Sequence, residues 1–145
     1  MKIAIGSDHA GFKLKEKVKK FLNKKKIEFK DFGCFSLDSC DYPDFAKPVA
    51  LAVSSGEFER GVLICGTGIG MTIASNKIKG IRAAHCLNTR MAKLTREHND
   101  ANILCLGARL IKMKDGLKIL ATFLRTDFLG GRHQRRIDKI DRLVD

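Results

Sequence analysis

The sequence predicts an α/β fold in which a parallel sheet is covered by helices on both faces. Short apolar runs alternate with amphipathic stretches along the chain. The continuous apolar run at residues 61–65 is typical of a strand buried on both faces. Strands that alternate with helices favour a parallel order. The 145 residues are the usual size of one domain, so we expect a single domain over residues 1–145.

The first half of the chain is predicted to hold two strands and two helices. Residues 2–6 form an apolar run too short for a signal peptide or a membrane span, which favours a strand. Residues 12–25 have helical spacing, and residues 27–32 follow as a second strand. The apolar stripe of the first helix consists of Leu14, Val18, Phe21 and Leu22. Its solvated face is expected to carry Lys13, Lys15, Lys17, Lys19, Lys20, Lys24, Lys25 and Lys26. Residues 44–55 form the second helix, with Phe45, Val49, Ala52 and Val53 on one side.

The second half continues the alternation with three strands and four helices. The strands are predicted at residues 61–65, 81–86 and 103–106. Helices are predicted from the turn after residue 65 to about residue 76, and at residues 89–98, 114–125 and 134–144. The last helix is expected to bury Ile137, Ile140 and Val144. Cys86 and Cys105 lie in apolar runs and are expected to be small core residues.

The formal charge of +12, from 28 basic and 16 acidic residues, raises the question of nucleic-acid binding. The chain has one tyrosine, no tryptophan and no basic-aromatic interleaving on which bases could stack. We therefore expect no nucleic-acid partner, and assign the positive field to the attraction of small anionic substrates. No membrane partner is expected, because no stretch approaches roughly 18 apolar residues.

The cysteine pattern argues against a disulfide framework and against structural zinc. Five cysteines are an odd number, and the spacing contains no paired Cys-x-x-Cys or Cys/His motif. We expect reduced thiols, a cytoplasmic protein, no metal and no cofactor. The glycines also fail as nucleotide fingerprints, since Met71 stands where a third glycine is needed and Phe12 where a P-loop has lysine.

The turn after the third strand is the strongest candidate for chemistry. It comprises Cys65, Gly66, Thr67, Gly68, Ile69 and Gly70. Glycines let the backbone approach a ligand, and a following helix start aims free N–H groups at an anion. A thiol at this place should be favoured as the thiolate, although a buried core cysteine is the alternative for Cys65.

Other polar residues have a structural alternative beside the functional one. Asp8 and His9 end the first strand, where Asp8 could equally cap the next helix. His98 and Asn99 end a helix, where they could serve as C-terminal capping residues. Arg132 and Arg136 lie four apart, so they share one helix face and could clamp a phosphate or form a solvated surface.

Taken together, these segments resemble the type B ribose-5-phosphate isomerases and the related galactose-6-phosphate isomerase subunits. The resemblance is carried, in order, by residues 6–11, 41–43, 64–70, 96–102 and 130–136. It implies a Rossmann-like three-layer sandwich, a five-stranded parallel sheet, and a homodimer whose active sites are shared between subunits. Dimers that pair into tetramers remain an alternative.

The resemblance also implies roles for individual residues. Cys65 is similar to the base that moves a proton between C1 and C2, and Thr67 with His98 to the pair that opens the sugar ring. The backbone of residues 66–70 would hold the enediolate. The remaining substrate contacts implied are Asp8 and Asn99 for sugar hydroxyls, and His9, Arg109, Arg132 and Arg136 for the phosphate region.

The expected reaction is the interconversion of D-ribose 5-phosphate and D-ribulose 5-phosphate in the non-oxidative pentose phosphate pathway. Such a reaction needs a base of near-neutral pKa and a stabiliser for the enediolate, which residues 65–70 could supply without a metal. Two alternatives stay open. One is isomerisation of a six-carbon sugar phosphate such as allose 6-phosphate or galactose 6-phosphate. The other is a non-catalytic nucleotide- or nucleic-acid-binding domain.

Overall fold

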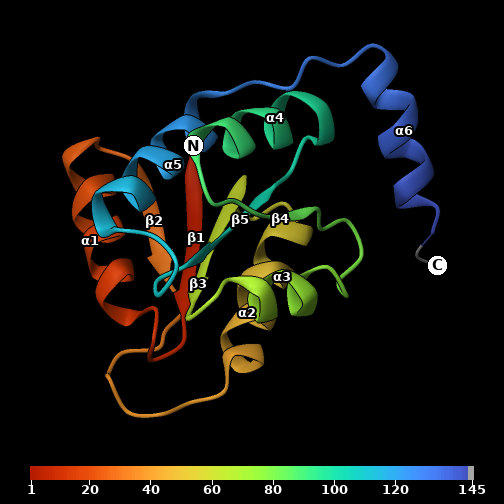
Figure 1. The fold of residues 1–145 in the computed structure, drawn as a ribbon. Helices are drawn as coiled ribbons and strands as arrows, with labels where there is room; N and C mark the ends of the chain where they lie inside the picture. Colours follow the sequence, from red (N-terminus) through yellow and green to blue (C-terminus); the bar gives the residue numbers. More distant parts are fainter. Residues whose placement is uncertain (144–145) are drawn as a thin grey trace.

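The computed structural model describes residues 1–143 and shows a parallel sheet between two layers of helices (Figure 1). The five strands are β1 (Lys2–Ser7), β2 (Glu28–Asp31), β3 (Arg60–Cys65), β4 (Ala83–His85) and β5 (Ile103–Gly107). The six helices are α1 (Phe12–Lys24), α2 (Tyr42–Ser54), α3 (Ile69–Ser75), α4 (Thr89–Asn99), α5 (Met113–Arg125) and α6 (Arg132–Asp141). The predicted α/β class, the five parallel strands and the helices on both faces are confirmed.

The strand order β2-β1-β3-β5-β4 places the switch in chain direction between β1 and β3. From β1 the chain crosses to β2 on one side, whereas β3 and the later strands lie on the other. The central pairing matches Ile5 with Val62, and β3 in turn pairs with β5. Ligands of open α/β sheets bind beyond the carboxyl ends of the strands at such a switch point. A site is therefore expected at the carboxyl-terminal edge of the sheet, where β1 and β3 end.

Two hydrophobic clusters lie on opposite faces of the sheet, because neighbouring residues of a strand point to opposite sides. On one face Ile5, Val62 and Leu104 pack with α1, α4 and α5. On the other face Leu63 and Cys105 pack with α2 and α3. Cys86 and Cys105 are both buried, as predicted, and burial raises the pKa of each thiol to about 12.

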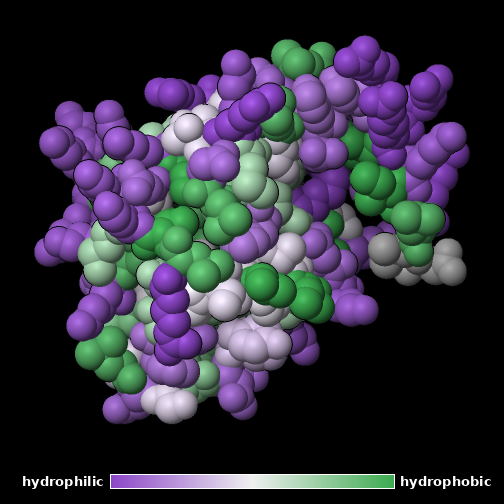
Figure 2. All heavy atoms as spheres, in the orientation of Figure 1, coloured by the Kyte–Doolittle hydropathy of each residue, from purple (hydrophilic) through white to green (hydrophobic). Residues whose placement is uncertain are grey.

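Lys15 contradicts the prediction that every lysine of the first helix lies on its solvated face. Its side chain is fully buried, with Nζ 2.7 Å from Oδ1 of Asp31 and a second hydrogen bond to the carbonyl oxygen of Cys34. The rings of Phe12 and Phe35 pack on the ammonium, with centroids at 5.6 and 5.1 Å. A buried charge needs such partners. Lys19 is half-buried, and hydrophilic side chains crowd over α1 in Figure 2. The exposed lysines of this set are Lys13, Lys17, Lys20, Lys24, Lys25 and Lys26.

Several element boundaries differ from the predicted ones for local reasons. Strand β4 is three residues long because the N–H of Arg82 donates to Oδ1 of Asn102 (2.9 Å) instead of joining a ladder. Helix α2 begins two residues early, with Pro43 in its first turn, where no backbone N–H is needed.

The predicted apolar face of α6 is only partly buried. Ile137 is buried as predicted, but Ile140 is 44% exposed in the single chain, so the predicted burial of Ile140 is wrong there. Val144 lies outside the described residues.

Helix α6 stands apart from the three layers at the right of Figure 1 and contacts α4. None of the helices within residues 1–143 has the length and apolar character needed to cross a bilayer.

Candidate active site

The turns after β1 and β3 meet at the switch point. The N–H of Asp8 donates to the carbonyl oxygen of Ile64 at 3.2 Å. Gly11 lies so close to the same strand that an added Cβ would be 2.4 Å from that oxygen. No real Cβ tolerates this approach, so glycine is required for the two turns to pack together.

Asp8 and His9 both lie at this edge of the sheet. Asp8 is largely buried, and its Oδ1 accepts the N–H of Gly11 at 3.0 Å. The N-cap of α1 is Gly11 and no side chain caps the helix, so Asp8 closes the turn before α1 and the predicted N-cap role is wrong. His9 is half-buried and its Nδ1 accepts the N–H of Cys40 at 3.2 Å. Because Nδ1 is the acceptor, a neutral His9 ring carries its proton on Nε2.

Cys65 is the last residue of β3, and its thiol is held by the turn that follows. Its sulfur accepts the N–H of Gly68 at 3.1 Å. Gly68 adopts φ +81°, a left-handed conformation that favours glycine. The exposed hydroxyl of Thr67 accepts the N–H of Ile69 at 3.2 Å. Cys65 is buried, as the core alternative requires, but its sulfur faces an oriented N–H group in a Gly-rich turn.

The turn after β5 completes this edge and brings in Arg109. The N–H of Arg109 donates to the carbonyl oxygen of Gly66 at 2.9 Å. A Cβ on Gly66 would lie 3.0 Å from Nη1 of Arg109, so the guanidinium packs on the backbone of the turn. Gly107 lies even closer to Thr67, where an added Cβ would be 2.4 Å from the carbonyl oxygen. The structure therefore brings Asp8, His9, Arg109 and residues 65–70 together.

His98 and Asn99 lie at the other end of the strands, where the strands begin. They end α4, and the carbonyl oxygen of Asn99 accepts from Nε of Arg82, the residue just before β4. Cys65, in contrast, ends its strand. A five-residue strand such as β5 spans roughly 16 Å, so the two groups within one chain cannot act on the same small molecule. The left-handed cap of α4 is Asp100 (φ 45°), not Asn99.

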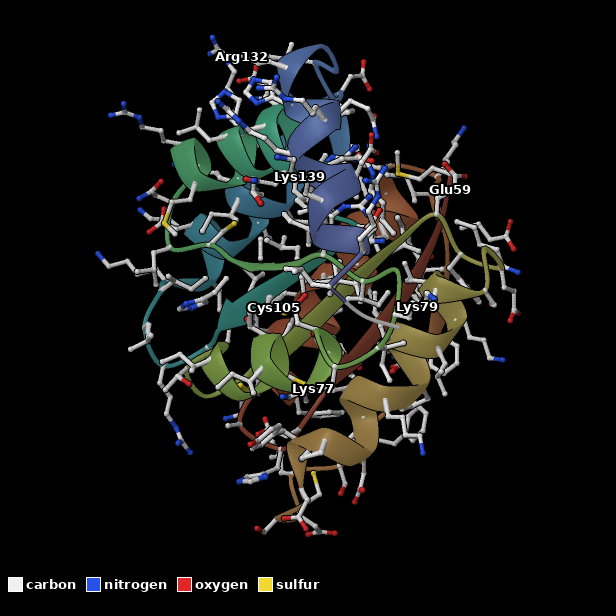
Figure 3. All side chains as sticks on the ribbon, turned by 90° about the vertical axis from the view of Figure 1, so that its right-hand side faces the viewer. Glu59, Lys77, Lys79, Cys105, Arg132 and Lys139 are labelled. Carbon is white, nitrogen blue, oxygen red and sulfur yellow. The ribbon has the colours of Figure 1, made fainter. Side chains whose placement is uncertain are left out.

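Arg132 and Arg136 lie with His98 rather than with Cys65. His133, between them in sequence, stacks on His98 with ring centroids 4.4 Å apart and planes within 12°. Figure 3 shows Arg132 at the end of α6 away from the carboxyl ends of the strands. Both arginines are exposed. Burial, followed by the proximity of His98 and of the charged Arg132 and Arg136, lowers the pKa of His133 and favours its neutral form.

The edge formed by the carboxyl ends of the strands therefore carries a thiol in a turn rich in N–H groups. The opposite edge carries two arginines and two stacked imidazole rings. Within residues 1–143 no three His, Cys, Asp or Glu side chains are arranged to hold a metal ion. The first edge can bind an anion and move a proton, and the second can bind a phosphate.

Comparison with known proteins identifies the family of the chain. The family model described as Ribose/Galactose Isomerase matches residues 3–140. The chain belongs to the ribose/galactose isomerase family. It is 45% identical to ribose-5-phosphate isomerase B of Escherichia coli, with 96% of this chain and 93% of that protein covered.

Two solved structures of this family superpose closely on the chain. A ribose 5-phosphate isomerase from Thermotoga maritima is 57% identical, with a TM-score of 0.95 and 97% of both chains covered. Ribose-5-phosphate isomerase B from Mycoplasma genitalium, solved with bound ribulose-5-phosphate, is 44% identical, with a TM-score of 0.95, covering 98% of this chain and 95% of that one.

Sequence reasoning assigned no role to two residues that the structure brings into contact with these groups. The ring of Tyr42 lies on Gly70, where an added Cβ would be 2.7 Å from Cζ. The family-like segment at residues 41–43 was the available signal for Tyr42. His133 stacks on His98, and only its position between two arginines in sequence could have indicated it.

Proposed function

We propose that the chain interconverts D-ribose 5-phosphate and D-ribulose 5-phosphate through an enediolate, as an aldose-ketose isomerase. The observation that carries this proposal is the Cys65 thiol, held by the N–H of Gly68 in a turn of alternate glycines at the switch point of the sheet. A base beside an anion-binding backbone is what proton transfer between neighbouring carbons requires. The names and the bound ketose of the close relatives support the pentose phosphate as substrate.

Cys65 would act as the base in this reaction. The thiolate takes the proton from C2 of the aldose, and the electrons move to the C1 oxygen to give the enediolate. Backbone N–H groups of residues 66–70 stabilise the negative oxygen. The thiol returns the proton to C1, and the proton of the C2 hydroxyl moves to the C1 oxygen, which leaves the ketone at C2. The Gly68 N–H stabilises the sulfur while it carries the charge. The step needs no metal, because the anionic intermediate is met by oriented N–H dipoles.

His98 and Thr67 would open the sugar ring before this step, with Asp8 and Asn99 binding hydroxyls. Arg132 and Arg136 would hold the phosphate, with His9 and Arg109 beside it. Arginine forks suit the bidentate recognition of phosphate oxygens. These groups lie at two opposite edges of one chain, so a complete site needs a second copy that brings His98, Asn99 and the arginines of α6 to the Cys65 turn.

We therefore propose a homodimer with two shared sites. Apolar side chains at the surface of α3 and α4 support a second copy there, since Ile69 and Ile73 are 51% and 59% exposed. Met91 and Leu94 on α4 and Ile140 on α6 are exposed as well, and Figure 2 shows hydrophobic residues at the surface over α3 and beside α6. A covering partner would bury them. Pairing of dimers into tetramers is tested by the mass of the particle in solution.

The experiment that tests the proposed substrate is a comparison of kcat/KM for ribose 5-phosphate and allose 6-phosphate on the purified protein. We expect the pentose phosphate to be preferred by at least tenfold. A preference for the hexose phosphate would replace the substrate but keep the mechanism. Salt-dependent binding of DNA or RNA without isomerase activity would overturn the enzyme assignment itself.

A further inference from the structure

Two cysteines that the proposed mechanism does not use contact the end of β1 and the turn after it, Cys34 at Ser7 and Cys40 at His9. Cys34 and Cys40 belong to the segment between β2 and α2, which follows the sheet edge next to Asp8 and His9. Residues 35–39 between them are exposed. Neither cysteine belongs to the hydrophobic cores that hold Cys86 and Cys105.

Cys34 is anchored to the end of β1. Its N–H donates to the carbonyl oxygen of Ser7 at 2.7 Å, and its carbonyl oxygen accepts from the buried ammonium of Lys15. Its sulfur lies 3.9 Å from Oγ of Ser7 and 3.3 Å from the carbonyl oxygen of Ser36. These contacts hold the Cys34 sulfur at the sheet edge, so it does not swing freely with the exposed part of the segment.

Cys40 is anchored at His9, two residues after the Ser7 that holds Cys34. Its N–H donates to Nδ1 of His9 at 3.2 Å, and its sulfur lies 3.9 Å from the same nitrogen. Cys40 is only half-buried, so a small oxidant can reach its sulfur. Burial raises the pKa of Cys40, and the neighbouring Cys34 adds to the rise. Both sulfurs lie at the same edge, Cys34 at Ser7 and Cys40 at His9, with only the exposed residues 35–39 between the two cysteines in sequence.

We propose that Cys34 and Cys40 form a reversible disulfide that modifies the substrate edge of this enzyme. The oxidant would be a hydroperoxide. A thiolate attacks the peroxide oxygen, the O–O bond breaks, and the sulfur becomes a sulfenic acid. The second thiol then attacks that sulfur, the S–S bond forms and water leaves. For hydrogen peroxide the balance is two thiols oxidised by loss of two hydrogens and one peroxide reduced to two waters.

The disulfide would act on the site through His9. Bonding the sulfurs closes the exposed segment of residues 35–39 into a small ring and moves Cys40 toward Cys34. The Cys40 N–H then leaves Nδ1 of His9, and the ring loses the contact that fixes its orientation and tautomer. This consequence rests on the proposed function, in which His9 lies in the phosphate region. Loss of one such hydrogen bond predicts a rise in KM of about three- to tenfold, with a smaller effect on kcat.

The test is mass mapping combined with kinetics on the full chain. Trypsin leaves residues 31–60 as one peptide, because proline follows Lys47, and it contains Cys34 and Cys40 but no other cysteine. After exposure to hydrogen peroxide in the Cys65→Ser variant, we expect this peptide to be lighter by two hydrogens and to return to its original mass with dithiothreitol. The rate of this change should rise with pH between 7 and 9, since the thiolate is the attacking species.

Cys40→Ser is the matched control, because it keeps the backbone N–H to His9 and removes the partner sulfur. Wild-type enzyme should show the rise in KM after oxidation and recover with dithiothreitol, whereas Cys40→Ser should keep its KM. The proposal is overturned if the peptide never loses the two hydrogens while other thiols oxidise, or if the cross-linked protein keeps the KM of the reduced one. If the reduced protein shows no isomerase activity at all, the proposed function fails, while the mass of the peptide still decides whether the disulfide forms.

Discussion

Gly68 allows a sharp test of the turn that holds Cys65, because Gly56 provides a matched control. Both glycines have φ +81°, but a Cβ at Gly56 would meet nothing within 4 Å. At Gly68 the Cβ would lie 2.9 Å from the carbonyl carbon of Leu106 and 2.7 Å from Cδ2 of His85. The histidine ring can turn aside, but the backbone of β5 cannot, so the turn must shift.

Gly56→Ala should lose only the conformational freedom of glycine. The left-handed conformation costs an alanine about 1–2 kcal/mol, of which about 0.4–1 kcal/mol is offset by the stiffer unfolded chain. Activity should not change. Gly68→Ala should lose at least as much stability, and should also pull its N–H away from the sulfur of Cys65.

The kinetic effect of Gly68→Ala follows from the hydrogen bond it disturbs. A hydrogen bond to a charged group contributes about 1.5–3 kcal/mol, which corresponds to a loss of roughly 10- to 100-fold in kcat/KM. The assay measures kcat/KM for ribose 5-phosphate and the unfolding free energy of both variants. A folded Gly68→Ala enzyme with wild-type kcat/KM would refute the reasoning, as would an equal loss of activity in Gly56→Ala.

Four further predictions concern metal dependence, the roles of His98 and Cys65, the buried Lys15, and the pH dependence of stability. Activity should survive exhaustive chelation with EDTA, and a loss that a divalent ion restores would contradict the metal-free mechanism. His98→Asn should slow net isomerisation far more than the exchange of the C1 hydrogen of ribulose 5-phosphate with deuterated water, because exchange needs no ring opening; Cys65→Ser should lose both by about 10²–10⁴-fold. Lys15→Met should destabilise the fold by about 3–5 kcal/mol, since it leaves a largely buried Asp31 without its closest partner. Burial raises the pKa of Asp31, but hydrogen bonds from Lys15, Gly33 and Lys19 outweigh this and lower it. The unfolded chain then binds the proton more readily, so wild-type stability should fall as pH drops below about 4, and denaturation of Asp31→Asn should lack that part of the fall.

The alternation of strands and helices was predictable because burial on both faces of a parallel sheet leaves a strong pattern in the sequence. The runs at residues 61–65 and 103–106 carry no polar residue, and both became central strands. The boundaries of β4 were not predictable in this way, because the side chain of Asn102, distant in sequence, takes the N–H of Arg82.

The burial of Lys15 could not be predicted from helical spacing. Its partner Asp31 and the rings of Phe12 and Phe35 come together only when α1 packs on β2 and the segment after it. In sequence Lys15 is one lysine among many. The exposure of Ile140 could not be predicted either. An apolar stripe predicts that a side chain is buried, but it does not say whether the covering surface belongs to the same chain.

The residues of the candidate site were predicted more completely than their positions relative to one another. The turn at residues 65–70 and the pair Asp8 and His9 were found from their positions at strand ends, and the structure brings them together. The separation of His98 from Cys65 follows from the direction of α4, which returns the chain to the other edge of the sheet. The contact of Cys40 with His9 was missed, because no pattern links the two residues.

The shared site is tested most directly by mixing two inactive variants, Cys65→Ala and the double variant Arg132→Ala with Arg136→Ala. Random pairing makes half of the dimers mixed, and each mixed dimer contains one intact site, so about a quarter of the wild-type activity should return. Exchange of subunits is verified from the mass of the mixed dimer. Activity that stays at the level of the separate variants, although mixed dimers have formed, would contradict a site built from two copies of the chain.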